Sequence, residues 1–285
     1  MTDYRKAYGL PQRYFLSLGR MVEKKNLATL IAAYGRYCDE WREPESAEIG
    51  RQGDQTSDES ARQAPASLVF VGSGELESAL REQVSRLGLI VVDRTNWRAG
   101  QSSETRDSLP AASHEENRGT VFFYGFRQIE ENPVFYALAE AFVLPSLKEE
   151  WGLVVNEAMA CSLPVIVSRT AGCAEDLLPG SAQVTSDGWR VTSKDAEDRK
   201  LTAESSRQAS QRPTGSDGSV EERPNGFIFD PSSVDALATA LASVAAMGDR
   251  RLEMGKRSRE IVKKFSCENF AQQALFAARA AHGNG

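Results

Sequence analysis

The sequence predicts an α/β fold, in which a doubly wound sheet of six parallel strands is followed by C-terminal helices. Short runs that are apolar at nearly every position recur along the chain, and several are followed by segments with apolar residues at helical spacing. Such runs are typical of strands that are buried on both faces, as in a parallel sheet. Their alternation with helices implies right-handed crossovers between neighbouring strands.

The predicted elements follow one another in a regular order. The six strands are expected at 14–19, 67–71, 121–125, 141–146, 164–168 and 227–230, with a candidate for a further short strand at 89–93. Helices are expected at 27–37, 75–87, 132–140, between Gly152 and Pro164, and at 172–178, 232–246, 250–264 and 267–281. Ser232 and Ser266 precede two of these helices and are predicted to be their N-caps.

Three long polar segments interrupt this pattern, at 39–65, 95–118 and 187–224. They are rich in charged and small polar residues and contain little that a core could bury, so we predict that they are disordered insertions. All three fall in connections between regular elements, where additional loop length costs little stability. The prediction is therefore a single domain that spans residues 1–285 and carries three insertions.

Composition narrows the class of protein. The formal net charge is −6, which argues against a general nucleic-acid binder. No apolar run approaches the ~20 residues of a membrane span, and the N-terminus has no signal-peptide core. The four cysteines and two histidines show no metal-binding spacing, so we predict a cytoplasmic protein without a metal site. The basic segment 250–264 is interpreted as a solvated helix face, and contact with an anionic lipid or acceptor is the alternative.

The stretch at 145–165, PSLKEEWGLVVNEAMACSLPV, organises the rest of the chain. It reads as a strand end, a polar loop, a helix after Gly152 and a second strand after Pro164. The loop therefore lies at the carboxyl edge of the sheet, where open α/β folds bind ligands. Glu149 and Glu157 flank the turn. Between them the start of the helix would present backbone N–H groups to an anion; the residues concerned are Trp151, Gly152, Leu153 and Val154.

This stretch resembles the signature of the family 4 retaining glycosyltransferases, which have the GT-B fold. Their pattern runs P-S-x-x-E, an aromatic residue, G-L, E-A-M-A and P-V, and its two glutamates are separated by seven residues, as Glu149 and Glu157 are here. Ser162 departs from the pattern, which has glycine there, and we expect a tighter turn before Pro164. The resemblance implies a Rossmann-like nucleotide-sugar-binding domain, the C-terminal half of a GT-B enzyme, with the N-terminal acceptor domain absent.

A second segment, LGRMVEKKN, resembles the family element that begins at Gly19 and whose Arg and Lys hold the donor diphosphate. The resemblance assigns these roles to Arg20 and Lys25. Arg offers a planar fork and Lys a point charge to the phosphate oxygens. Because a D-x-D metal motif does not occur in the chain, we predict that the reaction needs no metal and no cofactor. Two surface cations in an exposed loop are the alternative interpretation of Arg20 and Lys25.

The resemblance also assigns roles to the carboxylates. It implies that Glu157 takes the ribose diol of the nucleotide, and that Glu149 contacts hydroxyls of the transferred sugar close to the reacting carbon. Glu149, Arg20 and Lys25 are thus the predicted catalytic groups. Glu150 is expected to point to solvent. For Trp151, core packing is the alternative to a role in the site.

Two glycine-containing turns are weaker candidates. The family places the turn at 125–127 near the base, so Arg127 is a candidate for a base or phosphate contact, with a surface charge as the alternative. Gly72 and Gly74 are interpreted as a tight turn that lets backbone approach the donor. A dinucleotide fingerprint would need a third glycine where Glu77 stands, so a nicotinamide-dependent oxidoreductase is poorly supported.

Taken together, these residues predict the donor domain of a glycosyltransferase. It would transfer a hexose-type sugar from a nucleoside diphosphate sugar to an acceptor with retention of configuration. The alternative is a non-catalytic nucleotide-sugar-binding or assembly module that needs a separate acceptor-domain partner. Either interpretation makes the nucleotide sugar the principal partner, without nucleic acid and with membrane contact that is at most peripheral.

Overall fold

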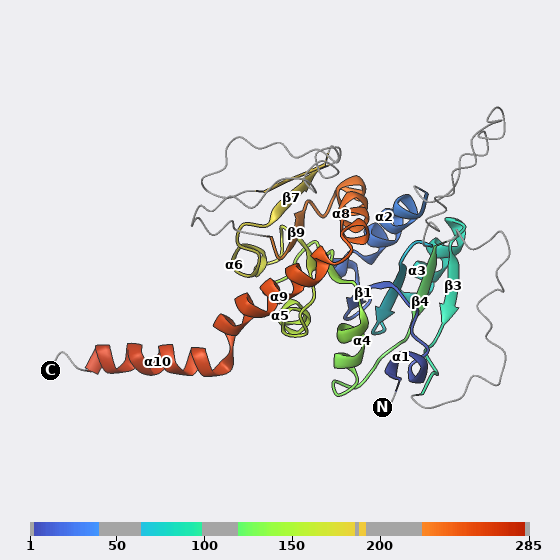
Figure 1. Ribbon diagram of the computed structural model, residues 1–285. Coiled ribbons are helices and arrows are strands. Elements are labelled where there is room, and N and C mark those ends of the chain that lie inside the picture. The colour runs from blue at the N-terminus through green and yellow to red at the C-terminus, as the bar shows by residue number, and fades with distance from the viewer. Residues whose placement is uncertain (1–2, 40–63, 99–118, 186–187, 192–223, 283–285) are drawn as a thin grey trace.

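The computed structural model describes residues 3–39, 64–98, 119–185, 188–191 and 224–282. The predicted α/β class is confirmed, because helices cover both faces of one sheet (Figure 1). Within the described residues this sheet has nine strands in the order β3-β4-β2-β1-β5-β6-β9-β7-β8. Eight of them run parallel, and only the edge strand β8 is antiparallel to its neighbour β7. The prediction of six strands was therefore wrong.

The strands are short and lie close to the predicted apolar runs. Their bounds are β1 Tyr14–Leu18, β2 Ser67–Val71, β3 Ile90–Asp93, β4 Thr120–Phe123, β5 Ala141–Leu144, β6 Val165–Ser168, β7 Ala182–Thr185, β8 Gly188–Val191 and β9 Gly226–Phe229.

The three strands beyond the predicted six lie at or near the edges of the sheet. The candidate at 89–93 is confirmed as β3, which is only half-buried at one edge of the sheet. In β7, buried Ala182 and Val184 alternate with exposed polar residues, so there is no apolar run to recognise. Strand β8 lies inside the segment 187–224, which was predicted to be disordered. That prediction was wrong for residues 188–191.

The helices also agree with the predicted pattern, apart from α1 near the N-terminus. Their bounds are α1 Tyr4–Ala7, α2 Leu27–Asp39, α3 Glu77–Arg86, α4 Asn132–Leu138, α5 Leu153–Ala160, α6 Ala174–Leu177, α8 Val234–Ala246, α9 Arg250–Val262 and α10 Cys267–His282, with 3-10 turns η1 Glu23–Lys25 and η3 Lys263–Phe265.

Two predicted helix caps had different outcomes. Ser266 is confirmed at the start of α10, because its Oγ accepts from the Asn269 N–H at 3.1 Å. The cap of α8 is one residue later than predicted: Ser233 accepts from the Ala236 N–H at 3.1 Å, whereas the Ser232 hydroxyl donates to Asp230. Ser162, the departure from the family pattern, takes a left-handed conformation with φ of 62° between α5 and β6. This is the conformation that a glycine adopts most easily.

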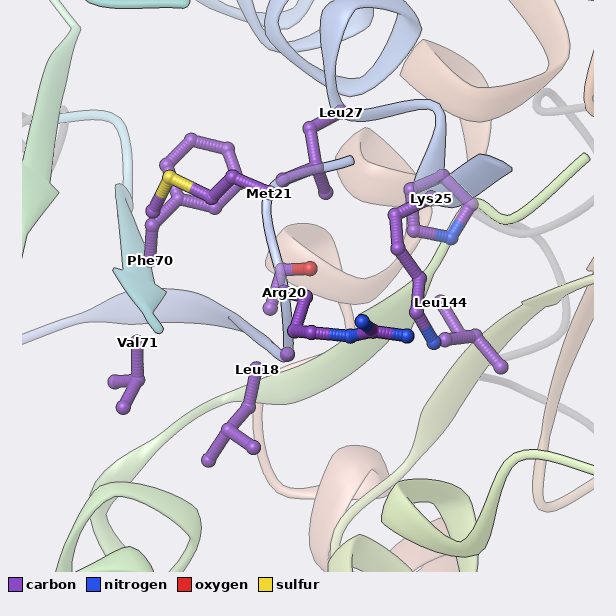
Figure 2. Close-up of a pocket in the computed structure, with 11 residues that line it drawn as sticks. Leu18, Arg20, Met21, Lys25, Leu27, Phe70, Val71 and Leu144 are labelled. Carbon is purple, nitrogen blue, oxygen red and sulfur yellow. The ribbon is translucent and has the colours of Figure 1, made fainter. Parts of the chain in front are cut away.

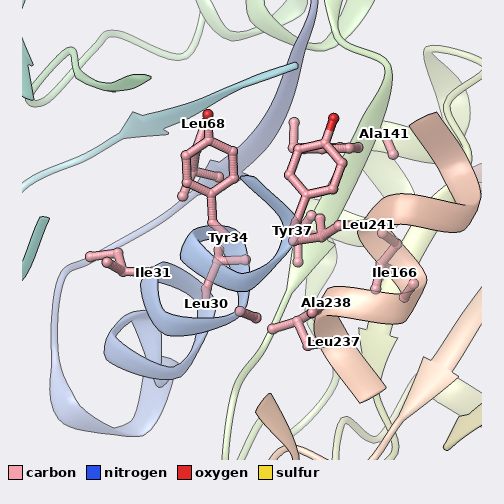
Figure 3. Close-up of a cluster of buried hydrophobic side chains, with 14 of the residues drawn as sticks. Leu30, Ile31, Tyr34, Tyr37, Leu68, Ala141, Ile166, Leu237, Ala238 and Leu241 are labelled. Carbon is pink, nitrogen blue, oxygen red and sulfur yellow. The ribbon is translucent and has the colours of Figure 1, made fainter. Parts of the chain in front are cut away.

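The sheet separates two buried layers. On one face, α2 and α8 pack together over the central strands, and their aromatic and aliphatic side chains meet those of the sheet (Figure 3). Tyr34 and Tyr37 of α2 are fully buried there, and their hydroxyls bond to main-chain groups at Thr120 and Ala66. On the other face, α4, α5 and α6 cover the sheet. The site described below lies at the ends of strands that both layers hold in place.

An ion-pair cluster at the amino edge of the sheet connects several elements. The Glu140 carboxylate, whose side chain is 7% exposed, accepts from Arg13 Nε at 2.7 Å and from Arg251 Nη1 at 2.8 Å. It thereby joins the segment before β1 to the start of α9.

Most of the predicted insertions, at 40–63, 99–118 and 192–223, lie outside the described residues. Among the described helices, none is long and apolar enough to cross a membrane.

Candidate functional site

The site forms where β1 and β5 end at the carboxyl edge of the sheet. After β1 the chain passes through Gly19, at φ 147°, into a loop and the short turn η1. Asn26 ends this loop in a left-handed conformation, and its side-chain amide donates to the carbonyls of Pro145 at 3.1 Å and Pro231 at 2.9 Å. One side chain therefore ties the loop after β1 to the loops after β5 and β9.

The glycines after β2 are explained by the same loop. A Cβ atom at Gly72 would lie 2.0 Å from the Gly19 carbonyl oxygen, and one at Gly74 would lie 2.4 Å from that of Met21. The predicted tight turn is thus present, and the backbone that it approaches most closely is the protein's own. Its approach to a donor stays a prediction.

A pocket opens between these loops, and Arg20 and Lys25 both line it (Figure 2). The Arg20 guanidinium and the Lys25 ammonium lie at the same end of the pocket, close to Leu144 of β5. Arg20 is exposed and Lys25 is largely enclosed. The remaining lining comes from β1, β2, the start of α2 and the loops that follow β1 and β5, namely Ser17, Leu18, Gly19, Met21, Leu27, Phe70, Val71 and Pro145.

Lys25 forms a direct ion pair with Glu149. Its Nζ contacts Glu149 Oε2, and the two side chains are only 16% and 11% exposed. The Ser146 hydroxyl donates to the same carboxylate oxygen at 3.3 Å. The adjacent pair of Lys24 and Glu150 is looser, at 3.5 Å, with the Glu150 side chain 71% exposed, as expected for a residue pointing to solvent.

The backbone that carries Glu149 is held from two sides. The Gly172 N–H donates to the Glu149 carbonyl at 2.9 Å, and the Leu147 N–H donates to the Lys24 carbonyl at 2.8 Å. Gly172 has to be glycine, because a Cβ there would lie 2.0 Å from the Glu150 carbonyl oxygen. The carboxylate therefore sits on a rigid loop and not on an adaptable one.

Helix α5 starts immediately after this loop. Gly152 takes φ 93°, and a Cβ there would lie 3.3 Å from Glu149 Cγ, so the helix start adjoins the carboxylate. Within the described residues, the N–H groups of Gly152, Leu153 and Val154 have no hydrogen-bond acceptor. They supply partial positive charge at the carboxyl edge of the sheet, as predicted for an anion site.

Glu157 lies further along α5 and has a different partner. The buried Tyr136 of α4 donates its hydroxyl to Glu157 Oε2 at 2.8 Å. Burial, together with the neighbouring Glu157 charge, raises the pKa of Tyr136 above the ordinary range of a phenol. Tyr136 is therefore a permanent donor to Glu157. Nothing in the spacing of the sequence indicated this tyrosine, because it appears as one more apolar position of a helix.

Arg127 is placed apart from the Lys25–Glu149 pair. It is 7% exposed, and its guanidinium donates to the carbonyls of Arg94 at 2.7 Å, Trp97 at 3.1 Å and Thr95 at 3.2 Å. Burial lowers its pKa from the ordinary value. Arg127 is thus not the surface charge of the alternative interpretation. It holds the turn after β3, and its contact with a base or phosphate stays a prediction.

Trp151 packs at the edge of the site. Its ring centroid lies 5.9 Å from that of Phe265 in η3, and its Nε1 donates to Asn156 Oδ1 at 2.9 Å. The packing interpretation of this side chain agrees with these contacts.

The structure thus brings Arg20, Lys25 and Glu149 together with the start of α5. Sequence reasoning missed Asn26, Ser146 and Tyr136, which position the predicted residues.

Comparison with known proteins identifies the family. Residues 2–203 match the family described as glycosyl transferases group 1, and the chain belongs to it. A GDP-mannose-dependent mannosyltransferase of Mycolicibacterium smegmatis, which acts on phosphatidylinositol monomannoside, is 31% identical over 195 residues, covering 66% of this chain and 38% of that protein. Sulfoquinovosyl transferase of Arabidopsis thaliana is 29% identical over 143 residues, covering 50% of this chain and 20% of that protein.

Solved structures support the same fold. Sucrose-phosphate synthase of Thermosynechococcus elongatus superposes with a TM-score of 0.56 at 21% identity, over 99% of this chain and 49% of that one. The Anabaena protein HepE, in complex with UDP, superposes with a TM-score of 0.56 at 17% identity, over 97% of this chain and 51% of that one. The chain therefore spans about half the length of these proteins.

Proposed function

We propose that this domain binds a nucleoside diphosphate sugar and serves as the donor half of a retaining glycosyltransferase. The observation that carries the proposal is the pocket at the carboxyl edge, where Arg20 and Lys25 converge. Lys25 is already paired with Glu149, but no described residue forms an ion pair with Arg20, so this end of the pocket favours an anionic ligand. The UDP bound to the HepE neighbour is a ligand of this chemical class.

The chemistry of sugar transfer explains why cations are needed there. When the bond from the anomeric carbon to the diphosphate breaks, negative charge accumulates on the leaving group. The N–H groups at the start of α5 are fixed before the reaction and stabilise that charge without reorganising, and Arg20 and Lys25 add their charges at the phosphate oxygens. The proposed mechanism needs no metal ion, since these groups take the place of the cation that a D-x-D site would hold.

The two carboxylates would then bind the neutral parts of the donor. Glu149 lies beside the cations and is proposed to accept from hydroxyls of a hexose-type sugar. Glu157 is proposed to accept from the ribose diol. A carboxylate has about four acceptor positions, and Tyr136 occupies one of those on Glu157, so two vicinal hydroxyls still find acceptors.

Calorimetric titration of the full chain with UDP-glucose, GDP-mannose and ADP-glucose tests the proposal. At least one donor should bind more tightly than ~1 mM, and Arg20→Ala should weaken it by about 1.5–3 kcal/mol, the range for a hydrogen bond to a charged group. Arg36→Ala is the matched control, because Arg36 is an exposed arginine on α2 that pairs with Asp235. Absence of binding to all three donors, or an equal loss in both variants, would refute the proposal.

Catalysis is a separate step of the proposal. We expect transfer from the bound donor to a simple acceptor to be slow or absent without an acceptor-binding domain, and any transfer to persist in the presence of EDTA with the anomeric configuration retained. The alternative, a non-catalytic nucleotide-sugar-binding module, requires donor binding without any transfer until an acceptor-binding chain is added. Transfer by this chain alone excludes that alternative.

A further inference from the structure

We propose that Lys25 and Glu149 form an exchangeable ion pair, which makes the site prefer a sugar-bearing nucleotide to the free nucleoside diphosphate. This inference rests on the function proposed above and concerns the same pocket. The two groups neutralise each other in the structure, and both side chains are largely enclosed, at 16% and 11% exposed. A diphosphate that recruits Lys25 therefore has to draw it away from an existing partner.

The Glu149 carboxylate has few other hydrogen-bond donors when Lys25 moves to the diphosphate. Among the described residues, the only other donor to its carboxylate is the Ser146 hydroxyl, at 3.3 Å. Ser146 is fully buried, and its own carbonyl is already engaged by the hydroxyls of Ser168 at 2.6 Å and Thr170 at 2.9 Å. The loop is thus fixed and does not carry Glu149 out into water. A carboxylate in such surroundings is strongly destabilised when its counterion leaves.

The two ligands differ in what they return to Glu149. A free nucleoside diphosphate draws the Lys25 ammonium toward its phosphate oxygens and leaves the carboxylate beside a second anion. A nucleoside diphosphate sugar draws the ammonium in the same way but brings hydroxyls that donate to Glu149. The nucleotide sugar therefore supplies a new partner for both Lys25 and Glu149, whereas the free diphosphate supplies one for Lys25 alone. After the sugar has been transferred, return of Lys25 to Glu149 favours release of the diphosphate.

Glu150 provides a matched control for this exchange. It is the next residue, it carries the same charge, and it pairs with Lys24 at 3.5 Å, but its side chain is 71% exposed. Neutralising Glu150 changes the local field by one charge without touching the Lys25–Glu149 pair. If neutralising Glu149 and neutralising Glu150 change anion binding equally, the change is due to the net charge near the site and not to exchange of the ion pair.

The test is calorimetric titration of the full chain and of its Glu149→Gln and Glu150→Gln variants, with UDP against UDP-glucose and GDP against GDP-mannose. In Glu149→Gln the free diphosphate should bind on the order of tenfold tighter, which corresponds to the loss of a competing charged contact. The nucleotide sugar should gain nothing or should bind more weakly. In Glu150→Gln the ratio of the two dissociation constants should stay that of the parent chain.

A second variant keeps the test sharp if glutamine at 149 perturbs the loop. Glu149→Ala also releases Lys25 from its partner, without placing an amide against the loop, so it should tighten the free diphosphate by a similar factor. The proposal is overturned if Glu149→Gln weakens the free diphosphate, or if it shifts both ligands equally. If both ligands bind the parent chain and Arg20→Ala abolishes binding, but Glu149→Gln leaves the ratio of the two dissociation constants unchanged, only the exchange fails. If neither binds, the proposed function fails with it.

Discussion

Replacing Tyr136 by phenylalanine should weaken recognition of the ribose while leaving the rest of the donor site intact. The hydroxyl that is removed donates to Glu157 Oε2 at 2.8 Å from a fully buried ring, so the change deletes one fixed contact and little volume. Glu157 then loses the group that holds its carboxylate in one orientation. A glutamate side chain without this contact has to be ordered by the ligand, which costs binding free energy.

The magnitude follows from the chemistry of the contact. Hydrogen bonds to charged groups contribute about 1.5–3 kcal/mol, and Glu157 is only half-buried, so water partly replaces the lost donor. We therefore expect a loss at or just below the lower end of this range, roughly 1–1.5 kcal/mol, or about a fivefold to twelvefold weaker affinity. The raised pKa of Tyr136 keeps the phenol protonated, so the loss should be the same at pH 6 and pH 9.

The assay is a binding cycle with UDP-glucose and its 2′-deoxyribose analogue, measured for the parent chain, Tyr136→Phe and Glu157→Gln. If Tyr136 acts through Glu157 on the ribose, both variants weaken the ribose ligand and hardly change the deoxy analogue. A merely structural role of Tyr136 would weaken the two ligands equally. Equal losses for both ligands, or a loss that appears only at high pH, would refute the reasoning.

Three further predictions concern the scaffold of the site. Gly72→Ala should destabilise the fold by about 1–3 kcal/mol more than Gly188→Ala in urea unfolding, because both positions have φ near 130° but only Gly72 has a backbone oxygen in the way. Glu140→Ala should cost about 3–5 kcal/mol, because two guanidiniums lose a buried partner; Glu253→Ala, at an exposed pair, should cost less than ~1 kcal/mol in the same assay. Burial raises the pKa of the Cys173 thiol to about 11, so iodoacetamide at pH 8 should modify exposed Cys267 and spare Cys173. Since the folded pKa lies above the usual 9.0, this thiol's contribution to stability is full below pH 9 and is lost as the pH rises through 11.

The sequence predicted those parts of the fold that depend on continuous apolar runs or on special backbone positions. Strands β5 and β6 bury every residue and were recognised, whereas β7 buries only Ala182 and Val184 in alternation and was not. The cap of α8 was misplaced because Ser232 and Ser233 are adjacent in the sequence. Which of them accepts from the first turn of the helix depends on the direction of the chain there. Spacing indicates that a position is polar, but which partner it meets depends on the packed structure.

The same distinction applies to the site. Arg20, Lys25 and Glu149 were predicted to share one edge of the sheet, because the carboxyl ends of parallel strands meet there, and the structure brings them together. Their direct pairing was not predicted, since it depends on how the two loops are tied by Asn26. Tyr136 comes from a helix that precedes the motif, so no local pattern connects it with Glu157.

The topology also explains how the chain accommodates long polar segments without disturbing the site. Helix α2 ends at Asp39 and β2 begins at Ser67, and because β2 is parallel to β1, its first residue lies at the amino edge. Strand β8 runs antiparallel to β7, so its last residue, like the first residue of β9, is also at the amino edge. The described chain therefore leaves and re-enters around two of the three polar segments at the edge opposite Arg20, Lys25 and Glu149. Extra length in connections at that edge costs little loop-closure entropy.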